Sequence, residues 1–177
     1  MVRLSLLIIG AIPVIFAVLI AAALVFQQEI PLTAVSPTDK ISMEYTKYQI
    51  KTVSFGVTEG VGSQYTEILK INNDREITYN TIEEGHTNPD KKSEISKEQL
   101  SKLTALIKET GFMEIPTDSF PVRDGVDDYK KFSLKVTLNG QTRQIHWVEQ
   151  NATDTFIPPI ISMVQLELDQ IINQLIE

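Results

Sequence analysis

The pattern of hydrophobic and polar positions divides the chain into three parts. The run from Leu4 to Phe26 contains no charged residue, and at a rise of about 1.5 Å per residue it can cross a hydrocarbon core of roughly 30 Å. The segment that follows contains two prolines and no hydrophobic periodicity, which is typical of an extended linker. We therefore predict a transmembrane signal anchor over residues 1–26, a linker over 27–44 and one soluble domain over 45–177.

The apolar run has a second interpretation as a cleavable signal peptide, with Arg3 as its basic region and Ala21-Ala22-Ala23 as the cleavage site. The apolar regions of signal peptides span only about 7–15 residues, so the length favours an uncleaved anchor. Arg3 precedes the run, and the first basic residue after it is Lys40. Because basic residues stay on the cytoplasmic side, we expect a single-pass cell-membrane protein whose C-terminal domain faces outward, or a secreted protein if the segment is cleaved.

Three strands are predicted in the first half of the soluble domain. Alternation begins near Lys47 and recurs at Gln64–Ile71 and Glu76–Ile82. The glycine-containing stretch from Gly56 to Gly62 separates the first two runs and is interpreted as a flexible hairpin loop. These runs predict an antiparallel meander, followed by a polar loop over residues 83–94.

The second half of the domain carries stronger local signals. Helical periodicity covers residues 97–110, Ser96 and Gln99 have the spacing of a capping box, and Gly111 is a typical helix stop. Farther on, Asn139-Gly140 is the preferred dipeptide of a two-residue type I′ hairpin. The register that this turn sets predicts four cross-strand pairs: Leu138 with Gln141, Val136 with Arg143, Leu134 with Ile145, and Phe132 with Trp147.

A last helix is predicted after Pro158-Pro159, since proline favours the first helical turn. Its apolar stripe consists of Ile161, Val164, Leu168, Ile171 and Leu175. The complete order is one transmembrane helix followed by a βββαββα domain. We therefore predict an α+β fold in which two helices pack on one face of an antiparallel sheet.

The charge pattern argues against nucleic acid as a partner. The chain has 16 basic and 23 acidic residues, a formal net charge of −7. Arg3 precedes the apolar run and every acidic residue follows it, so the part after the run has a net charge of −8. Its basic residues are interspersed with acids instead of forming the basic face that a polyanion requires.

Candidate catalytic and metal-binding residues are few. The chain has two histidines, His86 and His146, and no cysteine, which leaves no zinc-ligand cluster. By strand alternation His146 should lie on the face opposite Phe132 and Trp147. We expect neither an enzyme nor a bound cofactor or metal. The weaker alternative is a small hydrolase that uses His146 or the acids near residues 124–128.

Two loops are candidates for contact with a partner, because binding residues often lie on loops held by a rigid sheet. The first is the glycine-containing hairpin loop, and the second is an acidic loop between residues 116 and 128. The acidic loop lacks the ligand spacing of an EF-hand, so solvated turn acids are favoured over a calcium site. The candidate contact residues are Gly56, Gly60, Gly62, Asp124, Asp127 and Asp128.

A possible modification site lies in the polar segment before the last helix. Asn151-Ala152-Thr153 has the Asn-x-Thr pattern of an N-glycosylation acceptor. Asn151 is therefore a candidate acceptor if the domain faces outward.

The order of these features resembles the emfourin-like small α+β domains. The matching features are the capped helix from Ser96, the stretch Thr110-Gly111-Phe112-Met113-Glu114-Ile115-Pro116, the Asp-rich loop, the strand pair around Asn139-Gly140 and the proline-led last helix. The glycine-containing first hairpin is also similar, so the resemblance covers residues 47–177. The group includes proteinaceous inhibitors of thermolysin-type metalloproteases, which implies a binding domain and not an enzyme.

Together these features predict a membrane-anchored, outward-facing protein-binding module. Its contact with the membrane is expected through residues 4–26, and its expected partner is a protein such as a secreted or surface protease. The alternative is a structural or sensory subunit of a cell-envelope complex.

Overall fold

The computed structural model describes residues 35–55, 58–117 and 120–176, and within them the side chains of 53–61 are not described. The predicted membrane anchor over residues 1–26 lies outside the described residues. In the described part of the chain, no helix is long and apolar enough to cross a membrane.

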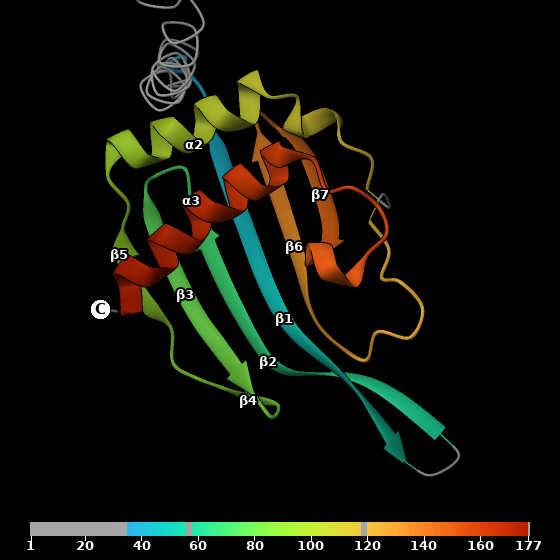
Figure 1. The fold of residues 1–177 in the computed structure, drawn as a ribbon. Coiled ribbons are helices and arrows are strands. Elements are labelled where there is room, and N and C mark those ends of the chain that lie inside the picture. Colours follow the sequence, from blue (N-terminus) through green and yellow to red (C-terminus); the bar gives the residue numbers. More distant parts are fainter. Residues whose placement is uncertain (1–34, 56–57, 118–119, 177) are drawn as a thin grey trace, which may run out of the picture. The chain divides into compact units, whose positions relative to one another are not determined.

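The centre of the domain is one antiparallel sheet with the strand order β4-β3-β2-β1-β6-β7, and β5 also pairs with β3. The long strand β1 lies in the middle, between β2 and β6 (Figure 1). Every pairing in the sheet is antiparallel. The strands are β1 (Ile41–Phe55), β2 (Thr58–Ile71), β3 (Glu76–Glu83), β4 (His86–Thr87), β5 (Lys91–Glu94), β6 (Asp128–Leu138) and β7 (Gln141–Val148).

Two helices, α2 (Lys97–Glu109) and α3 (Pro159–Ile176), lie on the same side of the sheet (Figure 1). The prediction of an α+β domain with two helices on an antiparallel sheet is therefore confirmed. The short 3-10 helices η2 (Phe112–Glu114) and η3 (Gln150–Ala152) follow α2 and β7.

The ends of α2 follow the predicted local signals. The Gln99 backbone N–H donates to the Ser96 hydroxyl over 3.0 Å, and the Ser96 N–H donates to the Gln99 side chain over 3.3 Å, which closes the capping box. Gly111 adopts a φ of 69°, in the left-handed region that favours glycine. The predicted helix start and stop are confirmed.

The core lies between the helices and the inner face of the sheet. Tyr45, Phe132 and Trp147 stack there, with ring centroids 5.4 Å apart for Phe132 and Trp147 and 6.4 Å apart for Tyr45 and Phe132. The buried stripe of α3 consists of Ile161, Val164, Leu168, Ile171 and Ile172, whereas the predicted Leu175 is half-buried. Each such side chain contributes about 1.5–3 kcal/mol through burial.

The β6–β7 hairpin has the predicted register, and all four predicted pairs are present. Asn139 and Gly140 have φ values of 51° and 85°, and a type I′ turn requires positive φ at both positions. Leu134 therefore faces Ile145, and both side chains are fully buried under the helices.

Three predicted boundaries differ from the structure. Strand β1 begins at Ile41 and not near Lys47, so its first residues come from the predicted linker. Strand β2 begins at Thr58, so the predicted hairpin loop is wrong in its extent, because Gly60 and Gly62 form ladder pairs with β1. The predicted polar loop contains β4 and β5, which add to the edge of β3. In β2, β4 and β5 tertiary strand pairing overrides low local propensity, whereas the start of β1 continues the buried alternation of Ile41, Met43 and Tyr45.

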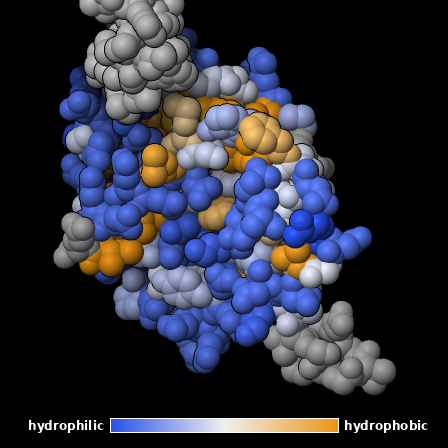
Figure 2. Space-filling view, in the orientation of Figure 1, coloured by the Kyte–Doolittle hydropathy of each residue, from blue (hydrophilic) through white to orange (hydrophobic). Residues whose placement is uncertain are grey.

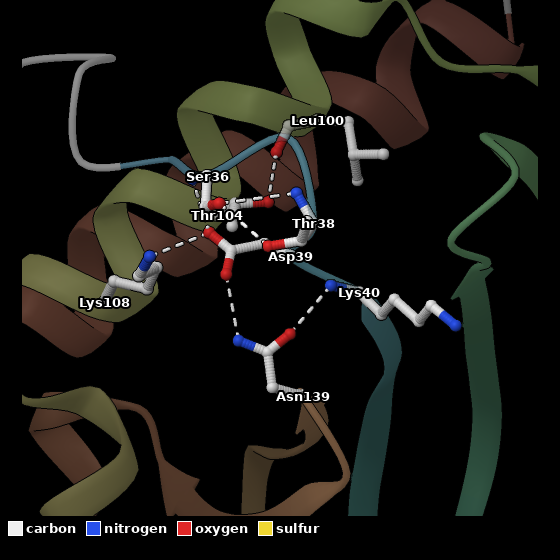
Figure 3. A network of polar contacts seen from close by, with 8 residues as sticks. All are labelled: Ser36, Thr38, Asp39, Lys40, Leu100, Thr104, Lys108 and Asn139. Atoms are coloured by element: carbon white, nitrogen blue, oxygen red, sulfur yellow. Dashed lines mark hydrogen bonds and ion pairs between the residues drawn. The ribbon is translucent and has the colours of Figure 1, made fainter.

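The segment before β1 is held to the domain by Asp39 (Figure 3). Its carboxylate accepts hydrogen bonds from Lys108 Nζ at 2.7 Å, Asn139 Nδ2 at 2.9 Å and the Ser36 backbone N–H at 2.7 Å. These donors lower the pKa of Asp39 to about 2, with Lys108 making the largest contribution. Asn139 also accepts from the Lys40 N–H over 2.9 Å. The start of β1 is thus fixed to α2 and to the β6–β7 turn.

Candidate functional site

One end of the β1–β2 hairpin extends beyond the rest of the sheet. The last β1–β6 pair is Lys51 with Asp128, and the last β2–β3 pair is Tyr65 with Glu83. Beyond these rows, residues 52–55 pair only with residues 58–61 among the described strands. We call the segment 52–61 the ribbon, and Figure 1 shows its two described strands projecting past the neighbouring strands.

The sequence of the ribbon suits contact with another protein. Val53, Phe55, Val57 and Val61 are apolar, and Glu59 is its only charged residue. A two-stranded ribbon also carries backbone N–H and C=O groups along its outer edges, which can pair with an added strand. Gly60 and Gly62 lie in β2, while Gly56 lies outside the described residues.

The predicted acidic loop lies at the base of the ribbon. Asp128 is the ladder partner of Lys51, which also pairs with Gly62. The Gln49 amide donates to Asp128 Oδ1 over 2.6 Å, and the Thr52 N–H donates to the Asp127 carbonyl over 2.7 Å. The structure therefore brings the two predicted contact regions to one end of the sheet.

The acidic side chains at this end do not form a metal site in the described structure. Asp124, Asp127 and Asp128 are exposed. Among the residues that the structure describes, no three His, Cys, Asp or Glu side chains are close enough to hold a metal ion. The arrangement offers a partner separate surface carboxylates beside the ribbon.

The candidate glycosylation residue belongs to the same end of the domain. Asn151 is exposed and lies in η3. Arg123 connects η3 to the acidic loop, because its N–H donates to the Ala152 carbonyl over 2.8 Å and its guanidinium pairs with Asp154 at 3.3 Å. A glycan on Asn151 would therefore stand close to the acidic loop.

A cavity of about 280 Å³ lies at the β6–β7 edge of the sheet, beside the ribbon end. His146 lines it and pairs with Ser133, on the face opposite Phe132 and Trp147 as predicted. The described lining contains no carboxylate, and the acids at residues 124–128 are not part of it. The arrangement needed for the hydrolase alternative, a histidine and an acid in one pocket, is not found among these lining residues.

A cluster of charged side chains lies under α3, and it was not predicted from the sequence. Lys47 forms ion pairs with Glu67 and with Asp169, the latter at 3.4 Å, and the Tyr45 hydroxyl donates to Asp169 over 3.4 Å. Burial and the neighbouring Asp169 raise the pKa of Tyr45. The signal was present in the alternation, since Lys47 shares the inner face with Tyr45. The cluster joins the centre of the sheet to α3.

Comparison with known proteins adds no family assignment. No protein-family model matches the chain, and no curated protein sequence matches it. The resemblance to emfourin-like domains therefore stays a prediction.

Proposed function

We propose that the chain is a membrane-anchored protein-binding module that faces outward and contacts its partner through the ribbon end of the domain. The observation that carries this proposal is the ribbon itself, a two-stranded projection whose edges pair with no other described strand and which lies next to exposed carboxylates. Such an edge supports strand addition, in which backbone hydrogen bonds give affinity and alternate side chains give specificity.

The direction of β1 also supports this proposal. The strand starts at Ile41, where Asp39 holds the preceding segment, and runs toward the ribbon. From Ile41 to Thr52 the strand covers about 36 Å at roughly 3.3 Å per residue. A domain tethered through its N-terminal segment would therefore present the ribbon at its far end.

A secreted or surface protease is the partner class that the emfourin-like resemblance implies. A narrow β ribbon has a shape that can enter an extended cleft, and strand addition supplies the binding mode. The purified full-length protein should then inhibit a thermolysin-type metalloprotease. If the protein does not inhibit the protease but the ribbon still crosslinks to a protein, the partner belongs to another class of protein.

A structural or sensory subunit of a cell-envelope complex is the second candidate. Four apolar side chains in or beside α3 are exposed, namely Phe156 at 73%, Met163 at 45%, Leu166 at 58% and Ile176 at 52%. Figure 2 shows separate apolar areas among polar ones on the side of the molecule that carries α3. A permanent neighbour would cover such side chains.

Photo-crosslinking in intact cells separates the two candidates. A benzoyl-phenylalanine is placed at position 55 in the ribbon, at 166 on α3, or at 141, which lies at the opposite end of the sheet from the ribbon. The proposal predicts a protein adduct from position 55 and none from 141. Adducts from position 166 alone would overturn the ribbon proposal and support the second candidate.

A further inference from the structure

The cavity at the β6–β7 edge combines an apolar wall with convergent polar groups. Phe120, Pro121, Val122 and Val148 form the apolar part of its described lining. Small-molecule sites are mostly apolar concavities in which a few polar groups fix the ligand's orientation. The volume of about 280 Å³ lies just below the roughly 300–1,000 Å³ of that class, so the ligand must be compact.

The described polar lining of this cavity includes one ammonium group, that of Lys131. Lys131 is exposed and lines the cavity, and no carboxylate of the described residues lies within ion-pair distance of it. Tyr129 and Thr117 add hydroxyl groups, and His146 adds an imidazole. The described lining has no acidic side chain, although the domain as a whole is acidic. An ammonium with hydroxyl donors beside an apolar wall favours a carboxylate joined to an apolar group.

We infer that this cavity binds a carboxylate carried by a compact aliphatic or aromatic group, with the carboxylate on Lys131 and the apolar group against Phe120 and Val148. Such a carboxylate can belong either to a free small acid or to the C-terminal residue of a peptide. This site goes beyond the proposed function, because its residues lie on β6, β7 and the loop before β6 and not on the ribbon.

The test uses full-length protein in non-ionic detergent with N-acetyl-leucine as the probe. Ligand-observed saturation-transfer NMR reports binding, and isothermal titration calorimetry gives an independent readout. N-acetyl-leucine should bind saturably, and N-acetyl-leucinamide, which lacks the carboxylate, should not. No binding in either readout, or equal binding of the amide, would overturn the inference.

Two lysine substitutions test whether N-acetyl-leucine binds in this cavity. Lys131→Gln should weaken N-acetyl-leucine binding about tenfold, which corresponds to loss of one charge-assisted contact of about 1.4 kcal/mol. Lys135→Gln is the matched control, because Lys135 is exposed on the same strand and face but does not line this cavity. Equal binding by both variants would contradict the assignment.

The source of the carboxylate is distinguished with peptides. An octapeptide that ends in a free leucine carboxylate should bind at least as tightly as N-acetyl-leucine if the natural ligand is a protein C-terminus. Weaker binding of the peptide would assign the site to a free small acid. Loss of peptide binding in Lys131→Gln with ribbon crosslinks unchanged would show that this site is separate from the proposed partner surface.

Discussion

At the scale of single residues, the charged side chains have unequal roles. Asp39 accepts three hydrogen bonds and its side chain is only 6% exposed, so it fixes the start of β1. Lys47 balances two carboxylates under α3. Other ion pairs, such as Lys70 with Glu44 at 3.9 Å, are largely exposed and contribute little to stability.

Asp39 predicts a component of stability that acid removes. Its pKa is lowered in the folded state from the ordinary 3.8 to about 2, so its contribution is complete above about pH 4 and is lost as the pH falls toward 2. Asp39→Asn should lose about 1 kcal/mol at pH 7 and show a smaller acid-dependent loss. Urea unfolding at several pH values measures this, with the exposed Asp154→Asn as control. Equal acid dependence of wild type and Asp39→Asn would contradict this role.

Lys47→Met should destabilise the domain by about 2 kcal/mol, because it leaves Glu67 and Asp169 close together without a cation. The side chain of Lys47 is 23% exposed, which places the cost below that of a fully buried pair. Lys70→Met is the matched control on the neighbouring strand, where the lysine is 54% exposed, and should change the free energy of unfolding by less than about 0.5 kcal/mol. Similar losses of unfolding free energy in both variants would show that the Lys47 cluster contributes no more to stability than an exposed ion pair.

At the scale of elements, two glycines differ in backbone conformation, although the sequence alone does not distinguish them. Gly140 has a φ of 85° in the β6–β7 turn, whereas Gly62 lies in β2 with no atom within 4 Å of an added Cβ. Gly140→Ala should cost more than about 1 kcal/mol, and Gly62→Ala should be neutral or slightly stabilising. Thermal unfolding of both variants checks this. Destabilisation by Gly62→Ala would mean that strand β2 requires glycine there.

The ribbon is expected to be dispensable for folding and necessary for binding. Replacing residues 53–60 by Asn-Gly joins Thr52 to Val61 through a two-residue turn and keeps every β1 pairing to β6. The shortened protein should keep its melting temperature within about 3 °C, since surface changes rarely exceed ±0.5 kcal/mol. It should no longer capture the partner found by crosslinking. Retained capture would place the contact elsewhere.

At the scale of the whole molecule, local signals predicted more than long-range ones. Asn139-Gly140 set the β6–β7 register, and Ser96 with Gly111 set the ends of α2, because each depends on residues a few positions apart. The pairing of β1 with β6 joins residues far apart in sequence, and no local signal specifies it. The contact of the acidic loop with the ribbon base follows from that pairing.

The candidate site was predicted in part for the same reason. Gly60 and Gly62 suggested a loop because glycine is unfavourable in strands, yet pairing with β1 extends the ladder through both. The glycine-containing stretch and the acidic loop were predicted as separate candidates, and their convergence at one end of the sheet required the strand order. The Lys47 cluster required the position of α3, which alternation alone does not give.

Protease protection in intact cells tests whether residues 1–26 anchor a domain that faces outward. Cells or spheroplasts carrying the full-length protein are treated with an external protease, and the mass of the untreated protein is read in parallel. We expect an untreated mass that includes the N-terminal segment, and digestion of the domain from outside. A domain protected until the membrane is opened, or a mass that lacks the N-terminal segment, would contradict it.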